Sequence, residues 1–187
     1  MTQIINNFHE ISDRYEALFV DLWGCVHGKV ILVTNSPRPR DQVVKQLRHF
    51  GVAEDAWDDI ATSGDSARTA MYRGMVGSDI WHLGPPTDKH FFDPIDILDD
   101  PVEINQVALE DAEGIVCTGP FDPLADPAIL RPQLLLAKQK GLKLLCANPD
   151  IVVDRGDIRE WCAGAVAALY TEMGGESLYF GKPHPPI

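Results

Sequence analysis

The sequence has little positive charge and no place where positive charge collects. Lysine and arginine number 16 against 28 acidic residues, the formal net charge is −12, and the basic residues are scattered. Nucleic-acid binding and attachment to anionic membranes both need a basic surface, so we expect neither as a partner. A protein of this charge that handles an anionic ligand must place a lysine, a metal ion or a helix N-terminus at one site.

Paired cysteines and long apolar runs are also absent from the sequence. The four cysteines, at positions 25, 117, 146 and 162, include no C-x-x-C pair. This spacing fits neither a zinc site nor a disulfide framework, so we expect reduced thiols. No apolar run approaches the ~20 residues that span a bilayer, and residues 1–10 show no basic stretch followed by an apolar one. We therefore expect a cytoplasmic protein.

What the sequence does have is a globular composition with strands and helices in alternation. Hydrophobic residues make up 45% and charged residues 24% of the 187, close to globular averages. Such a length allows one large domain or a domain with an insertion. Apolar runs predict strands at residues 17–23, 29–35, 78–83, 113–119, 142–148 and 177–182. Periodic segments predict helices at residues 65–74, 127–140 and 159–173, and one that ends near Phe50.

This alternation predicts an α/β fold with parallel, doubly wound sheets. Ligands of such sheets bind beyond the carboxyl ends of the strands. Asp21, Thr34, Asn148 and Lys182 all stand at such ends. We therefore expect the functional site among them.

The short link between the first two strands needs an explanation. Parallel neighbours require a crossover of a dozen or more residues, yet only residues 23–28 separate these strands. Either the strands form an antiparallel hairpin, or a crossover segment after Gly28 is absent. We favour absence, because a hairpin would put Asp21 and Thr34 at opposite ends of the sheet. The residues also stop at Ile187, before the helix and strand that would continue such a fold.

The strand ends carry the groups that phosphoryl transfer needs. A carboxylate at a strand end before a glycine-containing loop, here Asp21 before Gly24, can attack phosphorus. The reaction also needs hydroxyl or N–H donors for the phosphate oxygens and a cation, which Thr34 and Lys182 supply. Each residue has a plain alternative as well: an acid before a turn, a turn-capping threonine and a solvated surface lysine.

The strings "DLWGCVHG", "KVILVTNSPRP", "ANPDIVV" and "YFGKPHPPI" resemble the haloacid-dehalogenase superfamily. The similarity is to its class IIA, nitrophenylphosphatase-like subclass, here with a Trp-Gly first motif. The resemblance implies a Rossmann-like core with an inserted α/β cap domain. We assign residues 1–62 plus 176–187 to the core, which looks incomplete, and residues 63–175 to the cap.

The resemblance also implies a role for each matching residue. Asp21 matches the nucleophile, and Lys182 the lysine of the third motif. The phosphate-binding residues would be Leu22, Thr34, Asn35 and Lys182. A Mg²⁺ ion would be held by the Asp21 carboxylate, by the backbone carbonyl of Trp23 and by an acidic motif that would follow Ile187. Asn148 and Asp150 match the cap segment that faces the active site and helps to choose substrates, although a local turn explains them equally well.

One position departs from the family pattern. Trp23 stands where most of these phosphatases have the aspartate that protonates the leaving group. His27 could replace this general acid, since histidine titrates near neutral pH, or it could only pack within the loop. If the protein ends at Ile187, we expect weak metal binding and little turnover.

The function that follows is hydrolysis of small phosphomonoesters, with sugar phosphates among the candidates, through an aspartyl-phosphate and with Mg²⁺ as cofactor. The expected partner is a small phosphorylated metabolite. A second copy of the chain, in a homo-oligomer, is a further candidate partner. The alternative is a catalytically weak relative that binds a phosphorylated metabolite or a protein partner. Trp23 and the absent acidic motif favour this alternative.

Overall fold

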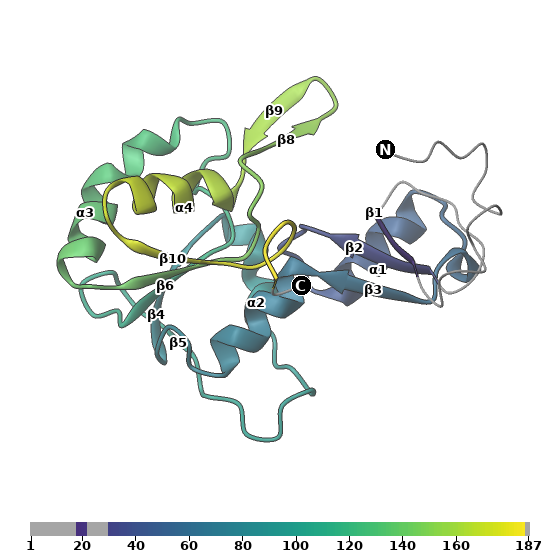
Figure 1. Ribbon diagram of the computed structural model, residues 1–187, viewed down its shortest axis with the longest axis horizontal. Coiled ribbons are helices and arrows are strands. Elements are labelled where there is room, and N and C mark those ends of the chain that lie inside the picture. The colour runs from purple at the N-terminus through teal and green to yellow at the C-terminus, as the bar shows by residue number, and fades with distance from the viewer. Residues whose placement is uncertain (1–17, 22–29, 186–187) are drawn as a thin grey trace, which may run out of the picture.

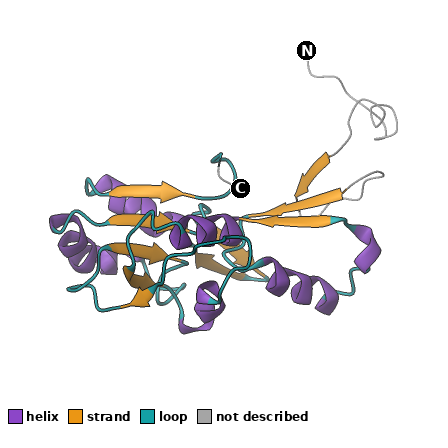
Figure 2. Cartoon of the chain, turned by 90° about the horizontal axis from the view of Figure 1, so that it is seen from below, coloured by secondary structure: helices purple, strands orange, loops and turns teal. Residues whose placement is uncertain are grey.

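The computed structural model of the chain describes residues 18–21 and 30–185, with the backbone alone for residues 18–21. Its strands form a three-stranded sheet, a five-stranded sheet and a two-stranded hairpin. The two larger sheets follow one another along the length of the molecule, with helices beside the strands (Figure 1 and Figure 2). The predicted α/β class is confirmed.

The first sheet has the strand order β1-β2-β3, and both of its strand pairs are parallel. Side chains of β2, β3 and α1 share one apolar cluster, in which Val30, Leu32 and Leu47 are buried. The parallel pairing of β1 with β2 rules out the antiparallel hairpin. The residues that join these strands, 22–29, lie outside the described residues, so the absent crossover stays a prediction. The elements of this part are β1 (Leu18–Asp21), β2 (Val30–Thr34), α1 (Arg40–His49), η3 (Glu54–Ala56) and β3 (Asp59–Thr62).

The second sheet has the strand order β10-β7-β6-β4-β5, again with every pair parallel. Helices connect most of its strands, as parallel pairing requires. The elements of this part are α2 (Ser63–Tyr72), β4 (Asp79–Leu83), η4 (Pro86–Phe92), β5 (Asn105–Gln106), β6 (Gly114–Cys117), η5 (Pro127–Leu130), α3 (Arg131–Gln139), β7 (Lys143–Cys146), α4 (Ala163–Glu172) and β10 (Glu176–Tyr179).

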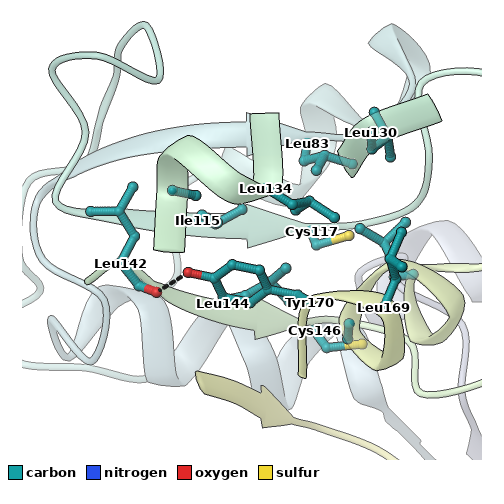
Figure 3. Packing of buried hydrophobic residues seen from close by; sticks show 14 of the residues in the cluster. Leu83, Ile115, Cys117, Leu130, Leu134, Leu142, Leu144, Cys146, Leu169 and Tyr170 are labelled. Carbon is teal, nitrogen blue, oxygen red and sulfur yellow. Dashed lines mark hydrogen bonds between the residues drawn. The ribbon is translucent and has the colours of Figure 1, made fainter. Parts of the chain in front are cut away.

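Both faces of the second sheet are buried. Along β6, Ile115 and Cys117 pack with α3 and α4, whereas Val116 packs with α2 on the other face. Successive side chains of a strand point to opposite faces, so an uninterrupted apolar run places apolar groups on both. Figure 3 shows the α3 and α4 side of this core, where Leu134 and Tyr170 cover the strands. The apolar runs of the sequence therefore predicted these central strands correctly.

A buried hydroxyl lies in this core. Tyr170 is fully buried, and its hydroxyl donates a hydrogen bond of 2.6 Å to the backbone oxygen of Leu142 (Figure 3). Replacing Tyr170 by Phe leaves that carbonyl without its donor, which typically costs ~1–3 kcal/mol. We expect the free energy of unfolding in urea to fall by about this amount, with an unchanged denaturant slope. Tyr179→Phe, at a half-buried position, is the control; equal losses in both variants would contradict the assignment.

The prediction of one long helix over residues 159–173 is wrong at its start. Residues Val152–Arg155 (β8) and Ile158–Trp161 (β9) form an antiparallel hairpin, and α4 begins only at Ala163. A two-residue turn with glycine first joins the strands, and Gly156 has a φ of +63°, which glycine adopts without strain. The Gly-Asp pair between two strand-forming runs was the signal for this hairpin.

The assignment of residues 1–62 plus 176–187 to a core and of residues 63–175 to a cap stays a prediction. β10 pairs with β7 through Leu178 and Leu145, so it belongs to the five-stranded sheet. The loop after it turns back toward β2 and lies between the two sheets (Figure 1). A short apolar run predicts a strand, but it does not specify the strands with which it forms hydrogen bonds. It therefore does not predict which sheet the strand joins.

The three cysteines of the described part, Cys117, Cys146 and Cys162, are free and buried. Burial raises the pKa of Cys146 to about 12 and that of Cys162 to about 11, and it raises the pKa of Cys117 too. These thiols are therefore neutral near pH 7, as inert structural cysteines are. Among residues 18–21 and 30–185, no helix has the length and the apolar surface that a membrane crossing would require.

Candidate active site

The carboxyl ends of β1 and β2 lie side by side. In the parallel register, Asp21 is the partner of Val33, and Thr34 follows one residue later. The backbone thus brings the expected nucleophile next to the expected phosphate-binding threonine. The side chain of Asp21 lies outside the described residues, as do the predicted sites Leu22, Trp23 and His27.

Lys182 reaches the same end of the sheet from the far end of the chain. Its ammonium Nζ donates a hydrogen bond of 3.2 Å to the backbone oxygen of Val33, the residue paired with Asp21. The side chain is half-buried. A positive charge therefore stands beside the strand end that carries Asp21, which is the local concentration of charge that an acidic protein needs to handle an anion.

Asn35 holds the backbone of Lys182 in place. The Asn35 Oδ1 atom accepts the Lys182 backbone N–H at 2.7 Å, and Asn35 Nδ2 donates to the Lys182 carbonyl oxygen at 3.0 Å. Asn35 Nδ2 also donates to Asp150 Oδ1 at 2.8 Å. Only 9% of Asn35 is exposed, so these bonds are screened from water. The Asn35 side chain is thus occupied by protein groups, so the predicted binding of phosphate by Asn35 would use its backbone N–H.

Gly181 allows the chain to pass close to Asn35. Its φ is +112°, and a Cβ atom there would come within 2.7 Å of Asn35 Oδ1 and of Ser63 Cβ. Only glycine fits this conformation and this approach without a shift of its neighbours. Neither Gly181 nor Ser63 was among the predicted site residues. The glycine of the "YFGKP" string was the available signal, because a glycine directly after a strand permits a positive φ; no comparable signal marks the serine.

Thr34 caps the turn after its strand, which was the alternative interpretation of this residue. Its Oγ1 accepts the backbone N–H of Ser36 at 3.2 Å, as a threonine does when it caps the turn after a strand. A hydroxyl that accepts one hydrogen bond still has a proton to donate. The turn-capping role is therefore compatible with donation to a phosphate oxygen.

Asn148 and Asp150 form a local turn next to the same site. Asn148 Oδ1 accepts the Asp150 backbone N–H at 2.9 Å, and Asn148 is buried. This contact is the local turn that the sequence allowed for. The segment also makes the Asp150 contact to Asn35, so it lies against the loop that follows β2.

A recess lies between the loop after β2 with the start of α1 on one side and the segment η4 on the other, and none of Thr34, Asn35, Asp150 and Lys182 lines it. It has a volume of about 210 Å³, with Pro37, Arg38 and Gln42 on one side and Thr87, Asp88 and His90 on the other. Burial raises the pKa of Asp88, which the hydrogen bond from Thr118 and the charge of Arg38 partly offset. A larger hollow of about 670 Å³ is lined by residues of β3, α2 and β10, and Thr34 and Lys182 are not among its lining residues either.

A histidine–threonine pair contacts the end of η4. His82 Nε2 is 3.0 Å from Thr118 Oγ1, and its ring meets that of Phe92 edge to face. Burial lowers the pKa of His82 to about 4, so the ring is neutral near pH 7. A neutral imidazole has one donor and one acceptor nitrogen, so Nε2 can form one hydrogen bond with the threonine hydroxyl, as donor or as acceptor according to the tautomer. The half-buried His82 therefore adds no positive charge next to η4.

The described residues by themselves hold no metal site. Across residues 18–21 and 30–185, no three histidine, cysteine, aspartate or glutamate side chains lie together in a metal-binding arrangement. The Asp21 carboxylate and the Trp23 carbonyl, the expected ligands, belong to the part that is not described. Both are oxygen donors of the type that Mg²⁺ prefers.

Comparison with known proteins gives the family of the chain. A crystal structure of a hydrolase of the haloacid dehalogenase-like family from Brucella suis matches 98% of this chain and 72% of its own, with 36% sequence identity and a TM-score of 0.85. The chain belongs to the haloacid dehalogenase-like family. The resemblance seen in the sequence is thereby confirmed.

More distant members of the haloacid dehalogenase-like fold are also similar. A 4-nitrophenylphosphatase from Thermotoga maritima matches 92% of this chain and 70% of its own, with 20% identity and a TM-score of 0.64. A glycerol phosphate phosphatase from Mycobacterium tuberculosis, in complex with calcium, matches 94% and 56%, with 18% identity and a TM-score of 0.66. These two similarities establish the shared fold. The chain matches no family model, and no curated protein matches it in sequence.

Proposed function

We propose that this haloacid dehalogenase-like protein is a magnesium-dependent phosphohydrolase that cleaves small phosphomonoesters, sugar phosphates among them, through an aspartyl-phosphate on Asp21. The observation that carries the proposal is the contact of Lys182 Nζ with Val33, the partner of Asp21 in the sheet. It brings the third-motif lysine, from the far end of the chain, to the strand end of the first motif.

In the first step, a carboxylate oxygen of Asp21 forms a bond to phosphorus while the bond to the leaving oxygen breaks. The leaving oxygen takes a proton, and water then cleaves the aspartyl-phosphate to return the carboxylate and release phosphate. The Lys182 ammonium, the Thr34 hydroxyl and the backbone N–H groups of Leu22 and Asn35 would hold the phosphoryl oxygens. A Mg²⁺ ion on Asp21 and the Trp23 carbonyl would neutralise phosphate charge.

The recess at η4 is our candidate place for the leaving group, because Pro37 and Arg38, which closely follow Thr34 and Asn35 in the chain, line it. Its volume of about 210 Å³ lies below the ~300–1,000 Å³ typical of pockets for drug-sized ligands, which favours a small ester. Its lining offers an arginine, a carboxylate and an amide to a polar group. His27 stays our candidate for the acid that protonates the leaving oxygen in place of the aspartate that Trp23 replaces.

The test is hydrolysis of 4-nitrophenyl phosphate by the purified protein with and without magnesium. We expect turnover with MgCl₂ and a loss of about 100-fold or more in EDTA, because a bound metal ion supplies several kcal/mol of charge stabilisation. Added Mg²⁺ should restore the rate. An equal rate in EDTA would contradict the proposed magnesium dependence. No turnover in the presence of Mg²⁺ would contradict the proposed phosphohydrolase activity.

Trp23 favours a second candidate, a relative that binds a phosphorylated metabolite or a protein partner with little catalysis. Loss of a general acid typically lowers the rate ~10²–10⁴-fold, and more so for alkoxide leaving groups than for nitrophenolate. Binding of inorganic phosphate, measured by calorimetry, together with no hydrolysis of either type of ester would favour this candidate.

A further inference from the structure

The Asn35 carboxamide lies between two parts of the chain that are far apart in sequence. One is the backbone of Lys182, which it contacts through both its oxygen and its nitrogen, at 2.7 and 3.0 Å. The other is the carboxylate of Asp150, which accepts from Asn35 Nδ2 at 2.8 Å. Asp150 is therefore one hydrogen-bonded residue away from the lysine of the proposed site.

A carboxylate at this position decides which way the carboxamide points. An ionised aspartate only accepts hydrogen bonds, so the NH₂ group of Asn35 must face Asp150. The opposite orientation would place Asn35 Oδ1 against the carboxylate and would turn the NH₂ group toward the Lys182 N–H. Only the observed orientation offers an acceptor to the Lys182 N–H and a donor to its carbonyl oxygen.

Asp150 is itself anchored on the five-stranded side of the molecule. Its backbone N–H is held by Asn148 Oδ1 at 2.9 Å, and its carbonyl oxygen accepts the N–H of Gly164 in the first turn of α4 at 3.1 Å. A Cβ atom on Gly164 would lie 2.5 Å from that carbonyl oxygen, so the contact is close. Asn35 follows β2 of the three-stranded sheet. The contact between Asp150 and Asn35 therefore joins the two sheets at the site.

We propose that Asp150 is a positioning residue for Lys182. It orients the Asn35 carboxamide, which fixes the Lys182 backbone so that the ammonium group stays beside Val33 and the Asp21 strand end. The inference rests on the proposed phosphohydrolase function, and it replaces the expectation that Asp150 selects substrates by contact. A residue that selects substrates changes their ranking, whereas one that positions the lysine changes all of their rates by one factor.

The experiment compares Asp150→Ala, Asp150→Asn, Asn35→Asp and the double variant Asn35→Asp with Asp150→Asn. Substrates are 4-nitrophenyl phosphate and sn-glycerol 3-phosphate, with kcat and KM measured separately. We expect Asp150→Ala to lower kcat about 10- to 100-fold for both esters by the same factor, with KM changed less than about threefold. Asp150→Asn should lose less, because its amide oxygen still accepts. Asp96→Asn, which removes an exposed carboxylate outside this cluster, is the matched control.

The double variant gives the sharpest result. Asn35→Asp sets two carboxylates against each other and removes the donor to the Lys182 carbonyl, so it should be the slowest single variant. Adding Asp150→Asn supplies an NH₂ group that can donate to the new carboxylate at position 35. The kcat should then recover at least about tenfold, a coupling of the size expected for contacting residues. A changed ratio between the two esters in Asp150→Ala, or no recovery in the double variant, would overturn the proposal.

A failure of the proposed phosphohydrolase function can be distinguished from a failure of the Asp150 proposal. If the unaltered protein hydrolyses neither ester, the phosphohydrolase proposal is contradicted. The coupling between Asp150 and Asn35 is then measured by thermal melting of the same four variants. The melting temperature of the double variant should exceed the value that the two single changes predict by addition. Strict additivity in melting would show that Asp150 and Asn35 are not coupled and would overturn the inference by itself.

Discussion

Asp21→Asn should abolish hydrolysis of 4-nitrophenyl phosphate, with kcat lowered by about 10⁴-fold or more. A neutral amide oxygen is a far weaker nucleophile than a carboxylate, and loss of the nucleophile in a covalent mechanism leaves only the positioning and charge of the site. The change conserves size, so the fold should be retained. Circular dichroism and the melting temperature should match those of the unaltered protein.

The position of Asp21 in the sheet is the reason for this expected size of effect. Its strand end pairs with Val33, and Lys182 donates to that same residue. Asp55→Asn, at an exposed position of η3, is the matched control and should keep full activity. Phosphoryl label from a labelled ester should remain on the unaltered protein after a rapid acid quench and be missing from Asp21→Asn. Equal rates for the two proteins would end the phosphoenzyme proposal.

Lys182→Met should give the second largest loss, with kcat lowered about 10²–10³-fold, the usual result of removing one group that stabilises transition-state charge. Methionine keeps most of the length and apolar bulk of the lysine stem but has no charge to set against the phosphoryl oxygens. The backbone bonds to Asn35 do not involve the side chain of Lys182, so the loop should stay in place. Steady-state kinetics with 4-nitrophenyl phosphate measure the effect.

Two further variants separate charge from geometry at this position. Lys182→Arg keeps the charge but carries a planar, bulkier head, and arginine does not replace lysine at a site shaped for one ammonium group. We expect it to recover only part of the activity. Lys45→Met, on the exposed surface of α1, removes a positive charge elsewhere and should change kcat less than about twofold. A Lys182→Met rate within about threefold of the unaltered protein would remove the lysine from the mechanism.

The position of the candidate site was predictable from the residues at strand ends. Asp21, Thr34 and Lys182 each follow an apolar run, and parallel strands present their carboxyl ends at one edge. The backbone of Asp21 and the side chain of Lys182 do lie at one edge of the sheet, whereas their roles in catalysis stay predictions. What the residues did not show is that Asn35 binds protein groups through its side chain, because an asparagine after a strand suits phosphate, a turn or a distant backbone equally well.

The errors in the predicted elements have local causes. The short strand β3 was missed because only Ile60 and Ala61 are apolar in it, so it has no run to detect. The start of the hairpin's second strand was taken for helix because the mixed charged and apolar residues of β9 also fit a helical period, and the Gly-Asp turn was given too little weight. Cross-strand ion pairs, Asp154 with Arg159 and Arg155 with Glu160, instead favour the hairpin.

The α/β class, most of the buried strands and the chemical groups at their ends could be inferred from the order of the residues. These follow from apolar runs and turn residues, which act over a few neighbouring positions. The tertiary structure was needed to show that β10 joins β7, that Lys182 meets Val33, and that the Asn35 side chain binds both Asp150 and the backbone of Lys182, a residue 147 positions away. Partners at such separations are selected by how the buried faces pack, and that choice depends on the whole chain at once.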